Sequence, residues 1–228
     1  MLLIFDCDGV LVDSEIIASQ VNLDVLKELG VDMTLEDMSE KYAGLAGKEI
    51  FARIAEELER PLPEDLEDRT DQMMDERMIQ SLQVVTGVEA MLDQLDREGL
   101  SRCICSNSRT ERLKRNLEQT NLLHRFDPHI YSSRLVGTKE PKPDPNVFLH
   151  ALSEFEAEPA TTLVVEDSAH GVMGAVAAGL RVVGFTGASH TYPGHAEQLM
   201  DAGAITTVNR LSDLPPTFEA LRNWSGEL

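Results

Sequence analysis

Positively charged residues are scarce in this sequence. Its 228 residues include 20 Lys and Arg but 40 Asp and Glu, so the formal net charge at pH 7 is -20. Proteins that bind nucleic acid or an acidic membrane surface present basic patches, so we expect neither partner. An anionic substrate stays open, because a few local cations or a metal ion can set the sign of the charge inside a cleft.

Cysteine is also rare. The three cysteines, Cys7, Cys103 and Cys105, match no zinc-binding spacing. All three lie in apolar runs, so we expect buried free thiols, which suit a reducing compartment.

Long hydrophobic runs are missing altogether. No stretch approaches the roughly 18 apolar residues that a membrane span needs. The apolar run after Met1 is four residues long and no basic segment precedes it, so we expect no signal peptide. With 42% apolar and 26% charged residues, the composition predicts a soluble, cytoplasmic protein, which we expect to be a monomer.

The sequence does contain short apolar runs, at residues 2–5, 102–105, 163–165 and 181–185. Continuous runs, rather than alternating ones, are typical of strands that are buried on both faces of a parallel sheet. Helical patterns separate them, at 88–98, 110–119, 145–155 and 168–178. This alternation predicts a doubly wound, Rossmann-like α/β fold.

An all-helical region interrupts the alternation after the first run. Helical patterns cover 15–29, 35–42, 48–59 and 65–82, without a strand-like run among them. We therefore predict two domains: an α/β core made of residues 1–13 and 85–228, and an inserted helical domain made of residues 14–84.

Acidic and hydroxyl side chains end three of the predicted strands. Asp6 and Asp8 follow the first run, Ser106 ends the second, and Glu166 and Asp167 end the third. Ligands of open parallel sheets bind outside the carboxyl ends of the strands, so we expect these side chains to meet at one edge. Carboxylates gathered in one crevice repel each other, and a divalent cation such as Mg²⁺ removes that cost.

The segment KEPKPDP, before the helix predicted at 145–155, can bring Lys139 or Lys142 to the same edge. Carboxylates, a metal, a hydroxyl and an ammonium together are typical of a phosphoryl-transfer site. Each residue taken alone has a structural explanation, since an aspartate at a strand end commonly caps a turn or a helix. The combination of these side chains at one edge of the sheet is what favours a catalytic role over a structural one.

At these residues the sequence resembles a known family. The stretches FDCDGVLVDSE, CSNS, KPDP and VVEDSAHGVMGAVAAG resemble the four signatures of the haloacid dehalogenase superfamily of phosphohydrolases. The helical insertion resembles the cap domain of the β-phosphoglucomutase-like branch. The signatures look most similar to the sugar-phosphate phosphatases of that branch, 6-phosphogluconate phosphatases among them. This resemblance implies a Mg²⁺-dependent phosphatase whose substrate is a small phosphorylated metabolite.

The resemblance also implies roles for the acidic residues. Asp6 is the nucleophile that becomes an aspartyl phosphate, and Asp8 is the general acid and base. Residues two apart in an extended chain point to the same side, so both carboxylates can face one substrate. The metal is held by Asp6, the backbone carbonyl of Asp8 and Asp167, with Glu166 close by.

The remaining site residues contact the substrate. By the same resemblance, Ser106 and the backbone of Asn107 hold phosphate oxygens, and Lys142 neutralises the transferring phosphoryl group. We prefer Lys142 to Lys139, because KPDPNVF reproduces the family's spacing from this lysine to the next helix. Lys48, in the loop at 42–49, is either a plain surface residue or the cation that binds a second anionic group, such as a sugar-acid carboxylate.

Several alternatives are weaker. Sugar-phosphate mutases of this branch carry a histidine at the position of Ala18, so we prefer a hydrolase, and dehalogenases lack the second aspartate. A receiver-like phospho-accepting signalling domain also uses an acidic cluster, a hydroxyl and a lysine, but it is shorter and has no helical insertion. A catalytically inactive binding protein on this fold has no need of Asp8.

The six histidines show no metal-binding spacing, and we expect them on the surface or in helices. They are His124, His129, His150, His170, His190 and His195. The last two belong to the loop at 187–195, which follows a predicted strand at the edge where the acidic residues gather. We expect a solvated loop there rather than a part of the site.

Overall fold

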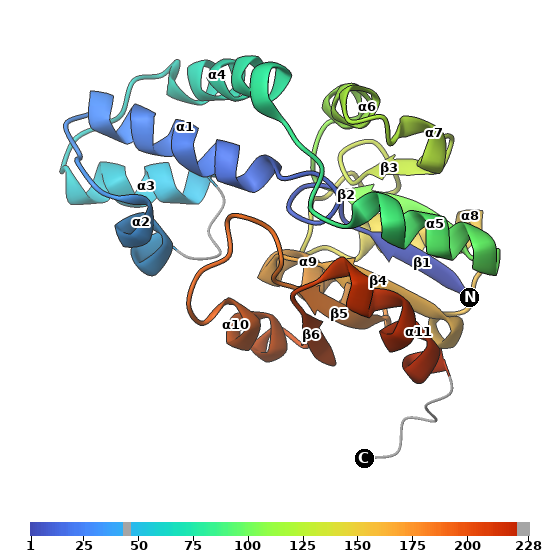
Figure 1. The fold of residues 1–228 in the computed structure, drawn as a ribbon. Helices are drawn as coiled ribbons and strands as arrows, with labels where there is room; N and C mark the ends of the chain where they lie inside the picture. Colours follow the sequence, from blue (N-terminus) through green and yellow to red (C-terminus); the bar gives the residue numbers. More distant parts are fainter. Residues whose placement is uncertain (43–46, 223–228) are drawn as a thin grey trace.

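The computed structural model of this chain describes residues 1–42 and 47–222, and the side chains of residues 39, 40 and 48 lie outside this description. Its centre is a six-stranded sheet in the order β3-β2-β1-β4-β5-β6, in which every neighbouring pair is parallel (Figure 1). The strands are β1 (Leu2–Phe5), β2 (Ser101–Ser106), β3 (Ile130–Ser132), β4 (Thr162–Glu166), β5 (Arg181–Phe185) and β6 (Thr206–Val208). The predicted doubly wound fold is confirmed.

The two outer strands, β3 and β6, are absent from the sequence-based prediction, which was incomplete in this respect. Each is three residues long and lies at an edge of the sheet. A strand this short carries too little of a repeating pattern to be recognised from the sequence. The four central strands are longer and coincide with the four apolar runs.

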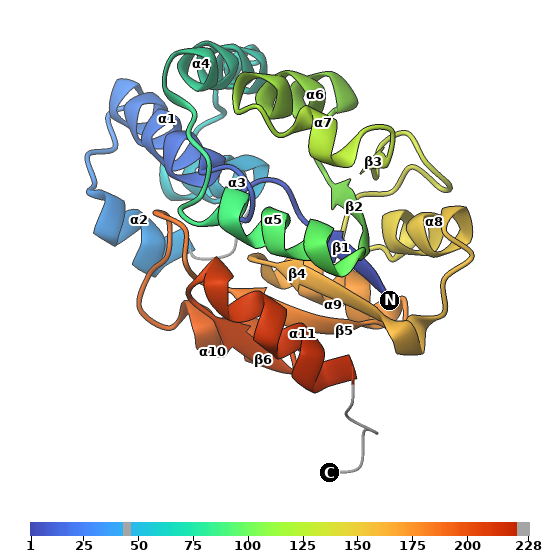
Figure 2. The ribbon, with the colours of Figure 1, turned by 45° about the vertical axis from the view of Figure 1, so that its right-hand side comes forward.

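Helices cover both faces of the sheet, as Figures 1 and 2 show together. In β1, Leu3 and Phe5 pack into one hydrophobic cluster, whereas Leu2 and Ile4 pack into the other. The first cluster includes α5 (Val88–Glu98), α6 (Thr110–Gln119), α7 (Leu123–Phe126) and α11 (Leu214–Arg222); the second includes α8 (Asn146–Glu154), α9 (Ala169–Ala177) and α10 (His195–Asp201). Short 3-10 turns at Pro159–Thr161 and Leu211–Asp213 join some of these elements. Burial on both faces explains why the strands read as continuous apolar runs.

Among the described residues, four helices lie between β1 and α5 in the sequence, and we call them the helical unit. They are α1 (Ser14–Glu28), α2 (Leu35–Tyr42), α3 (Gly47–Glu57) and α4 (Leu66–Ser81). Figure 1 shows them gathered to one side of the sheet, and Val21, Leu26 and Ile54 belong to a separate hydrophobic cluster within the unit. Their bounds agree closely with the helical patterns of the sequence.

The two chain segments that join the helical unit to the sheet domain run side by side. The backbone N–H of Asp13 donates to the carbonyl of Gln83 at 2.9 Å, and that of Val85 donates to the carbonyl of Leu11 at 3.0 Å. These pairings bring both joints to one place, beside the residues that follow β1.

A second contact joins α4 of the helical unit to α6. Arg115 donates to Asp75 at 2.7 Å, the Nε of Arg112 lies 2.8 Å from the same carboxylate, and Gln119 donates to the carbonyl of Met78 at 3.0 Å. Because α6 follows β2, this contact places the helical unit against the carboxyl-end side of the sheet.

Two expectations from the composition can be checked directly. The three cysteines are buried free thiols, as predicted. Within residues 1–42 and 47–222, the structure contains no helix with the length and apolar character that crossing a membrane requires.

Candidate active site

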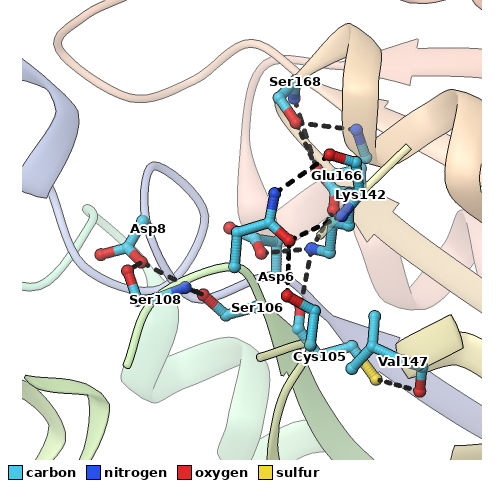
Figure 3. A network of polar contacts seen from close by, with 12 residues as sticks. Asp6, Asp8, Cys105, Ser106, Ser108, Lys142, Val147, Glu166 and Ser168 are labelled. Atoms are coloured by element: carbon cyan, nitrogen blue, oxygen red, sulfur yellow. Dashed lines mark hydrogen bonds and ion pairs between the residues drawn. The ribbon is translucent and has the colours of Figure 1, made fainter. Parts of the chain in front are cut away.

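The carboxyl ends of three neighbouring strands meet near the middle of the sheet (Figure 3). The central strand β1 is followed by Asp6 and Asp8, β2 ends at Ser106, and β4 ends at Glu166, which Asp167 follows. Asp6, Glu166 and Asp167 each offer an oxygen, and these oxygens lie within 4.8 Å of one another. The structure therefore gathers at one edge the acidic residues that the sequence places far apart.

The ammonium of Lys142 lies inside this cluster. Its Nζ donates to Asp6 Oδ1 at 2.6 Å, to Glu166 Oε1 at 2.5 Å and to the carbonyl of Cys105 at 2.7 Å (Figure 3). The side chain is only 3% exposed. Lys139, the other candidate lysine, is exposed. Of the two lysines, Lys142 is thus the one that reaches the strand ends.

Burial and charge act in opposite directions on these groups. Burial lowers the pKa of Lys142, but the neighbouring carboxylates of Asp6 and Glu166 outweigh it, so the pKa is raised and the ammonium stays charged. Burial raises the pKa of Asp6 well above its ordinary value; Lys142 opposes this effect, and the charges of Glu166, Asp167 and Asp8 add to it. The cluster therefore carries more negative charge than its one ammonium compensates.

This donor set suits a hard divalent cation. Mg²⁺ prefers one or two carboxylates together with water and phosphate oxygens. Asp6 and Asp167 supply such carboxylates, and the surplus of buried negative charge favours a cation. Both oxygens of Glu166 already accept protein donors, Oε1 from Lys142 and Oε2 from the Ser168 hydroxyl at 3.1 Å. Glu166 thus mainly orients the lysine, while remaining within reach of the cluster.

The carboxylate of Asp8 is held by hydroxyl groups instead. Ser14 donates to its Oδ1 at 2.8 Å, and Ser108 and Ser106 donate to its Oδ2 at 2.7 and 3.3 Å. Asp8 is not among the described residues that form the three-carboxylate cluster. The two aspartates of the first motif therefore have different surroundings, one beside an ammonium and the other among hydroxyls.

Asn107, which follows Ser106, holds the lysine segment in place. Its Oδ1 accepts hydrogen bonds from the backbone N–H of Lys142 and from the hydroxyl of Ser133, both at 2.8 Å. Its Nδ2 donates to the carbonyl of Lys142 at 3.3 Å. Both polar atoms of the Asn107 side chain thus bind the neighbouring protein, and its backbone carbonyl accepts from Arg134 at 2.9 Å, so its backbone N–H is the group that can face a phosphate.

This constellation agrees with a family match over most of the chain. Residues 3–185 match the family model described as haloacid dehalogenase-like hydrolase. The chain belongs to this family. The predicted family is confirmed, and the receiver-like alternative is set aside.

Named members of this hydrolase family are similar to the chain over nearly its whole length. The 6-phosphogluconate phosphatase of Escherichia coli K12 is 27% identical over 221 residues, which are 96% of this chain and 95% of that protein. The phosphorylated carbohydrates phosphatase of Thermotoga maritima is 26% identical over 90% of this chain and 92% of its own. The crystal structure of a haloacid dehalogenase-like protein from Agrobacterium tumefaciens is 46% identical and superposes with a TM-score of 0.91, covering 96% of this chain and 98% of that one.

The hydrolase site opens into a cavity of about 440 Å³ between the strand ends and the helical unit. The described side chains that line it from the helical unit include Glu15, Ala18, Ser19, Asn22, Met38, Tyr42, Ile50, Asp71 and Met74. Lys48 belongs to α3, but its side chain lies outside the described residues, so both interpretations of this lysine, as a surface residue or as a substrate-binding cation, stay predictions.

The loop at 187–195 is not simply solvated, so that expectation was wrong, whereas the position of His195 at the start of α10 agrees with the expected placement in a helix. His195 is buried and its Nε2 donates to the carbonyl of Asp167 at 2.6 Å. His190 Nε2 lies 3.0 Å from Asp167 Oδ2, and its side chain is 13% exposed. Burial lowers the pKa of His195. Both histidines line the cavity, because the loop folds back across the end of β4.

Sequence reasoning also missed two polar residues of α1. Glu15 and Asn22 lie seven positions apart, so they share a helix face with Ala18, and all three line the cavity. Burial raises the pKa of Glu15 to about 7, and the nearby charges of Asp167 and Asp8 add to the effect. The helical spacing of these side chains was a signal that could have identified the face.

Proposed function

We propose that this hydrolase removes phosphate from a small phosphorylated sugar or sugar acid, with Mg²⁺ and through an aspartyl phosphate on Asp6. The observation that carries the proposal is the buried ammonium of Lys142, bound to Asp6 and Glu166 within a cluster of three carboxylates. A nucleophilic carboxylate, a charge-neutralising lysine and a cation site together suit phosphoryl transfer.

In this mechanism the two aspartates of the first motif act in sequence. The Asp6 carboxylate attacks phosphorus, while Asp8 protonates the leaving oxygen. Asp8 then takes a proton from the water that hydrolyses the aspartyl phosphate. The hydroxyls of Ser14 and Ser108 keep the Asp8 carboxylate beside the site but apart from the cation ligands, which supports its separate role.

The proposed ligands of Mg²⁺ are the carboxylates of Asp6 and Asp167 and the backbone carbonyl of Asp8, with Glu166 at the border of the site. When bound, the ion neutralises phosphate oxygens and keeps carboxylates ionised. Lys142 contributes a further positive charge.

Phosphate oxygens are held, in this proposal, by the Ser106 hydroxyl and the backbone of Asn107. The Ser106 hydroxyl lies 3.3 Å from Asp8 and accepts a hydrogen bond from the Ser108 N–H at 3.0 Å, so it lies directly beside the proposed general acid. One chain supplies every proposed site residue, so we expect the monomer to be active.

We further propose that residues 14–84 act as a cap domain over a core made of residues 1–13 and 85–228. The separate hydrophobic cluster of the helical unit and the paired joints at 11–13 and 83–85 support this division. A cap that closes over the cavity excludes water while the leaving group departs. The catalytic residues proposed in the core act on the phosphate group and the metal, so in this proposal the side chains of the helical unit that line the cavity select the leaving group.

A hydrolase is preferred to a mutase for a specific reason. A mutase needs a group on the cap that exchanges protons with a sugar hydroxyl, and the corresponding position is Ala18, which lines the cavity. The described cavity residues of the helical unit include no histidine.

A sugar-like leaving group is supported by the names of the relatives and by the cavity. The Escherichia coli and Thermotoga maritima relatives are named for phosphorylated carbohydrates or a sugar-acid phosphate. In the cavity wall, the Oδ1 of Asn22 is buried and has no hydrogen-bond partner among the described residues. Buried polar groups normally have partners, so an unpaired acceptor beside a ligand cavity suits a substrate hydroxyl.

Phosphate release from a panel of phosphorylated metabolites tests the proposal. We expect sugar and sugar-acid phosphates to be hydrolysed with Mg²⁺, activity to vanish after chelation, and Asp6→Asn to fall to background. Asp8→Asn should lower kcat by about 10²–10⁴-fold but leave Mg²⁺ binding intact in calorimetry. Full turnover after exhaustive chelation, or a collapse of Mg²⁺ affinity in Asp8→Asn, would contradict the proposed roles.

A further inference from the structure

His190 contacts the acidic cluster from a part of the chain outside the four family signatures. It lies in the loop between β5 and α10, and its Nε2 is 3.0 Å from Asp167 Oδ2. The side chain is 13% exposed, so the contact is largely shielded from solvent. A carboxylate oxygen can only accept, so Nε2 is the donor.

The loop that carries His190 is anchored on both sides of this contact. Ser189 donates from its backbone N–H to Asp13 at 3.1 Å and also from its hydroxyl to the same carboxylate. On the other side, His195 donates to the Asp167 carbonyl, and the ring of Tyr192 stacks on it with centroids 4.7 Å apart. These anchors restrict the positions that the His190 ring can take.

The turn after Asp8 is shaped to admit the same contact. Gly9 has a φ of +75°, and a Cβ placed there would lie 1.9 Å from Asp167 Oδ2 and 2.9 Å from His190 Cε1. Only glycine leaves room for the carboxylate and the imidazole side by side. The backbone of the first motif and the 187–195 loop thus enclose one oxygen of Asp167 from two sides.

We propose that His190 is a positioning residue that holds one carboxylate oxygen of Asp167 and thereby presents the other to Mg²⁺. The inference rests on the proposed function, since it takes Asp167 as a ligand. Hydrogen-bond partners of ligating side chains fix their orientation, and losing one weakens metal affinity by about 10–100-fold. A histidine that merely fills space would leave that affinity unchanged.

Calorimetry with Mg²⁺ alone, without substrate, tests this inference on the full chain. His190→Ala should weaken Mg²⁺ binding by about 10–100-fold. His190→Gln should retain most of the affinity, because the glutamine Nε2 amide can donate near the original nitrogen. His190→Asn has an amide too, but it is shorter, and should behave like His190→Ala. His124→Ala, which changes an exposed histidine of α7, is the matched control.

The pattern across the variants decides the question. Melting temperatures in the presence of a chelator verify that each variant folds. If His190→Ala does not fold, the comparison of His190→Gln with His190→Asn still tests the inference. Weak Mg²⁺ binding by His190→Asn together with near-normal binding by His190→Gln supports a hydrogen-bond donor role for His190. Equal, near-wild-type Mg²⁺ affinity in all His190 variants overturns the inference while leaving the phosphatase proposal standing. A wild-type protein that neither binds Mg²⁺ nor releases phosphate overturns both.

Discussion

The ammonium of Lys142 lies 2.6 Å from a carboxylate oxygen of Asp6, although 136 positions separate the two residues in the chain. Parallel strands explain how this happens. The ends of β1 and β4 are neighbours, and Asn107, just after β2, hydrogen-bonds both the N–H and the carbonyl of Lys142. The lysine is therefore built into the same edge as the carboxylates it neutralises.

This contact predicts that removing the lysine charge greatly lowers the free energy of unfolding. Lys142→Met leaves the buried carboxylates of Asp6 and Glu166 without their cation, and breaking a buried pair in this way costs about 3–5 kcal/mol. We expect urea unfolding of the metal-free variant at pH 7.5 to show a loss of that order. Adding Glu166→Gln should recover part of it, since one uncompensated charge disappears.

The surface pair of Lys41 and Glu57 supplies a control for that experiment. Both side chains are more than 40% exposed, so Lys41→Met should change stability far less. A Lys142→Met protein that is as stable as wild type, or a double variant that is no more stable than the single one, would show that the ammonium does not compensate these carboxylates.

We predict that replacing Asn22 weakens substrate binding with little change in the stability of the protein. If its unpaired oxygen accepts a substrate hydroxyl, Asn22→Ala should raise KM for a phosphorylated sugar by about 2–10-fold, the equivalent of one hydrogen bond. KM for p-nitrophenyl phosphate, which lacks such hydroxyls, should stay the same. Stability should change little, because the Oδ1 that the variant removes is buried without a partner in the described residues.

Asn116 provides the matched control, since its Oδ1 is also buried and unpaired among the described residues but does not line the cavity. Asn116→Ala should leave both KM values unchanged. Equal increases in KM for the sugar phosphate and for p-nitrophenyl phosphate in Asn22→Ala would point to a general effect on the cavity and against recognition of a hydroxyl.

Glu15 predicts a pH-dependent stability of the metal-free protein. Its pKa is raised from 4.5 to about 7 by burial and by neighbouring carboxylates, so the folded state binds the proton more tightly than the unfolded state does. Below pH 4.5 Glu15 is protonated in both states and does not destabilise the fold. As the pH rises from 4.5 to 7, the unfolded state loses the proton first, so Glu15 lowers the free energy of unfolding progressively. Glu15→Gln should therefore stabilise the protein little at pH 5 and by up to about 3 kcal/mol at pH 8.

Chemical denaturation in the presence of a chelator, at a series of pH values, measures this difference. Glu36→Gln removes the same charge from an exposed position of α2 and serves as the control. A stability difference between Glu15→Gln and wild type that stays constant from pH 5 to pH 8, or that shrinks, would show that Glu15 does not titrate in this way.

Much of the candidate site was predictable because its residues sit at recognisable places in the chain. Asp6 directly follows a strand, and Ser106 and Glu166 each end one, that its apolar residues reveal, and parallel strands place their carboxyl ends at one edge. The resemblance to the hydrolase family then favoured Lys142 over Lys139. The resemblance could not supply the contacts that the site residues make, such as the hydrogen bonds from hydroxyl groups to Asp8.

The sequence by itself determined the buried sheet, the inserted helices and the strand-end acids, because burial on both strand faces and helix periodicity are local patterns that survive in a single chain. Only the tertiary structure decided that the loop at 187–195 folds back, that His190 holds Asp167 and that Glu15 and Asn22 face the same cavity. Those relationships depend on packing between segments far apart in the chain. No local spacing encodes the direction in which a loop returns or the surroundings that a side chain meets there.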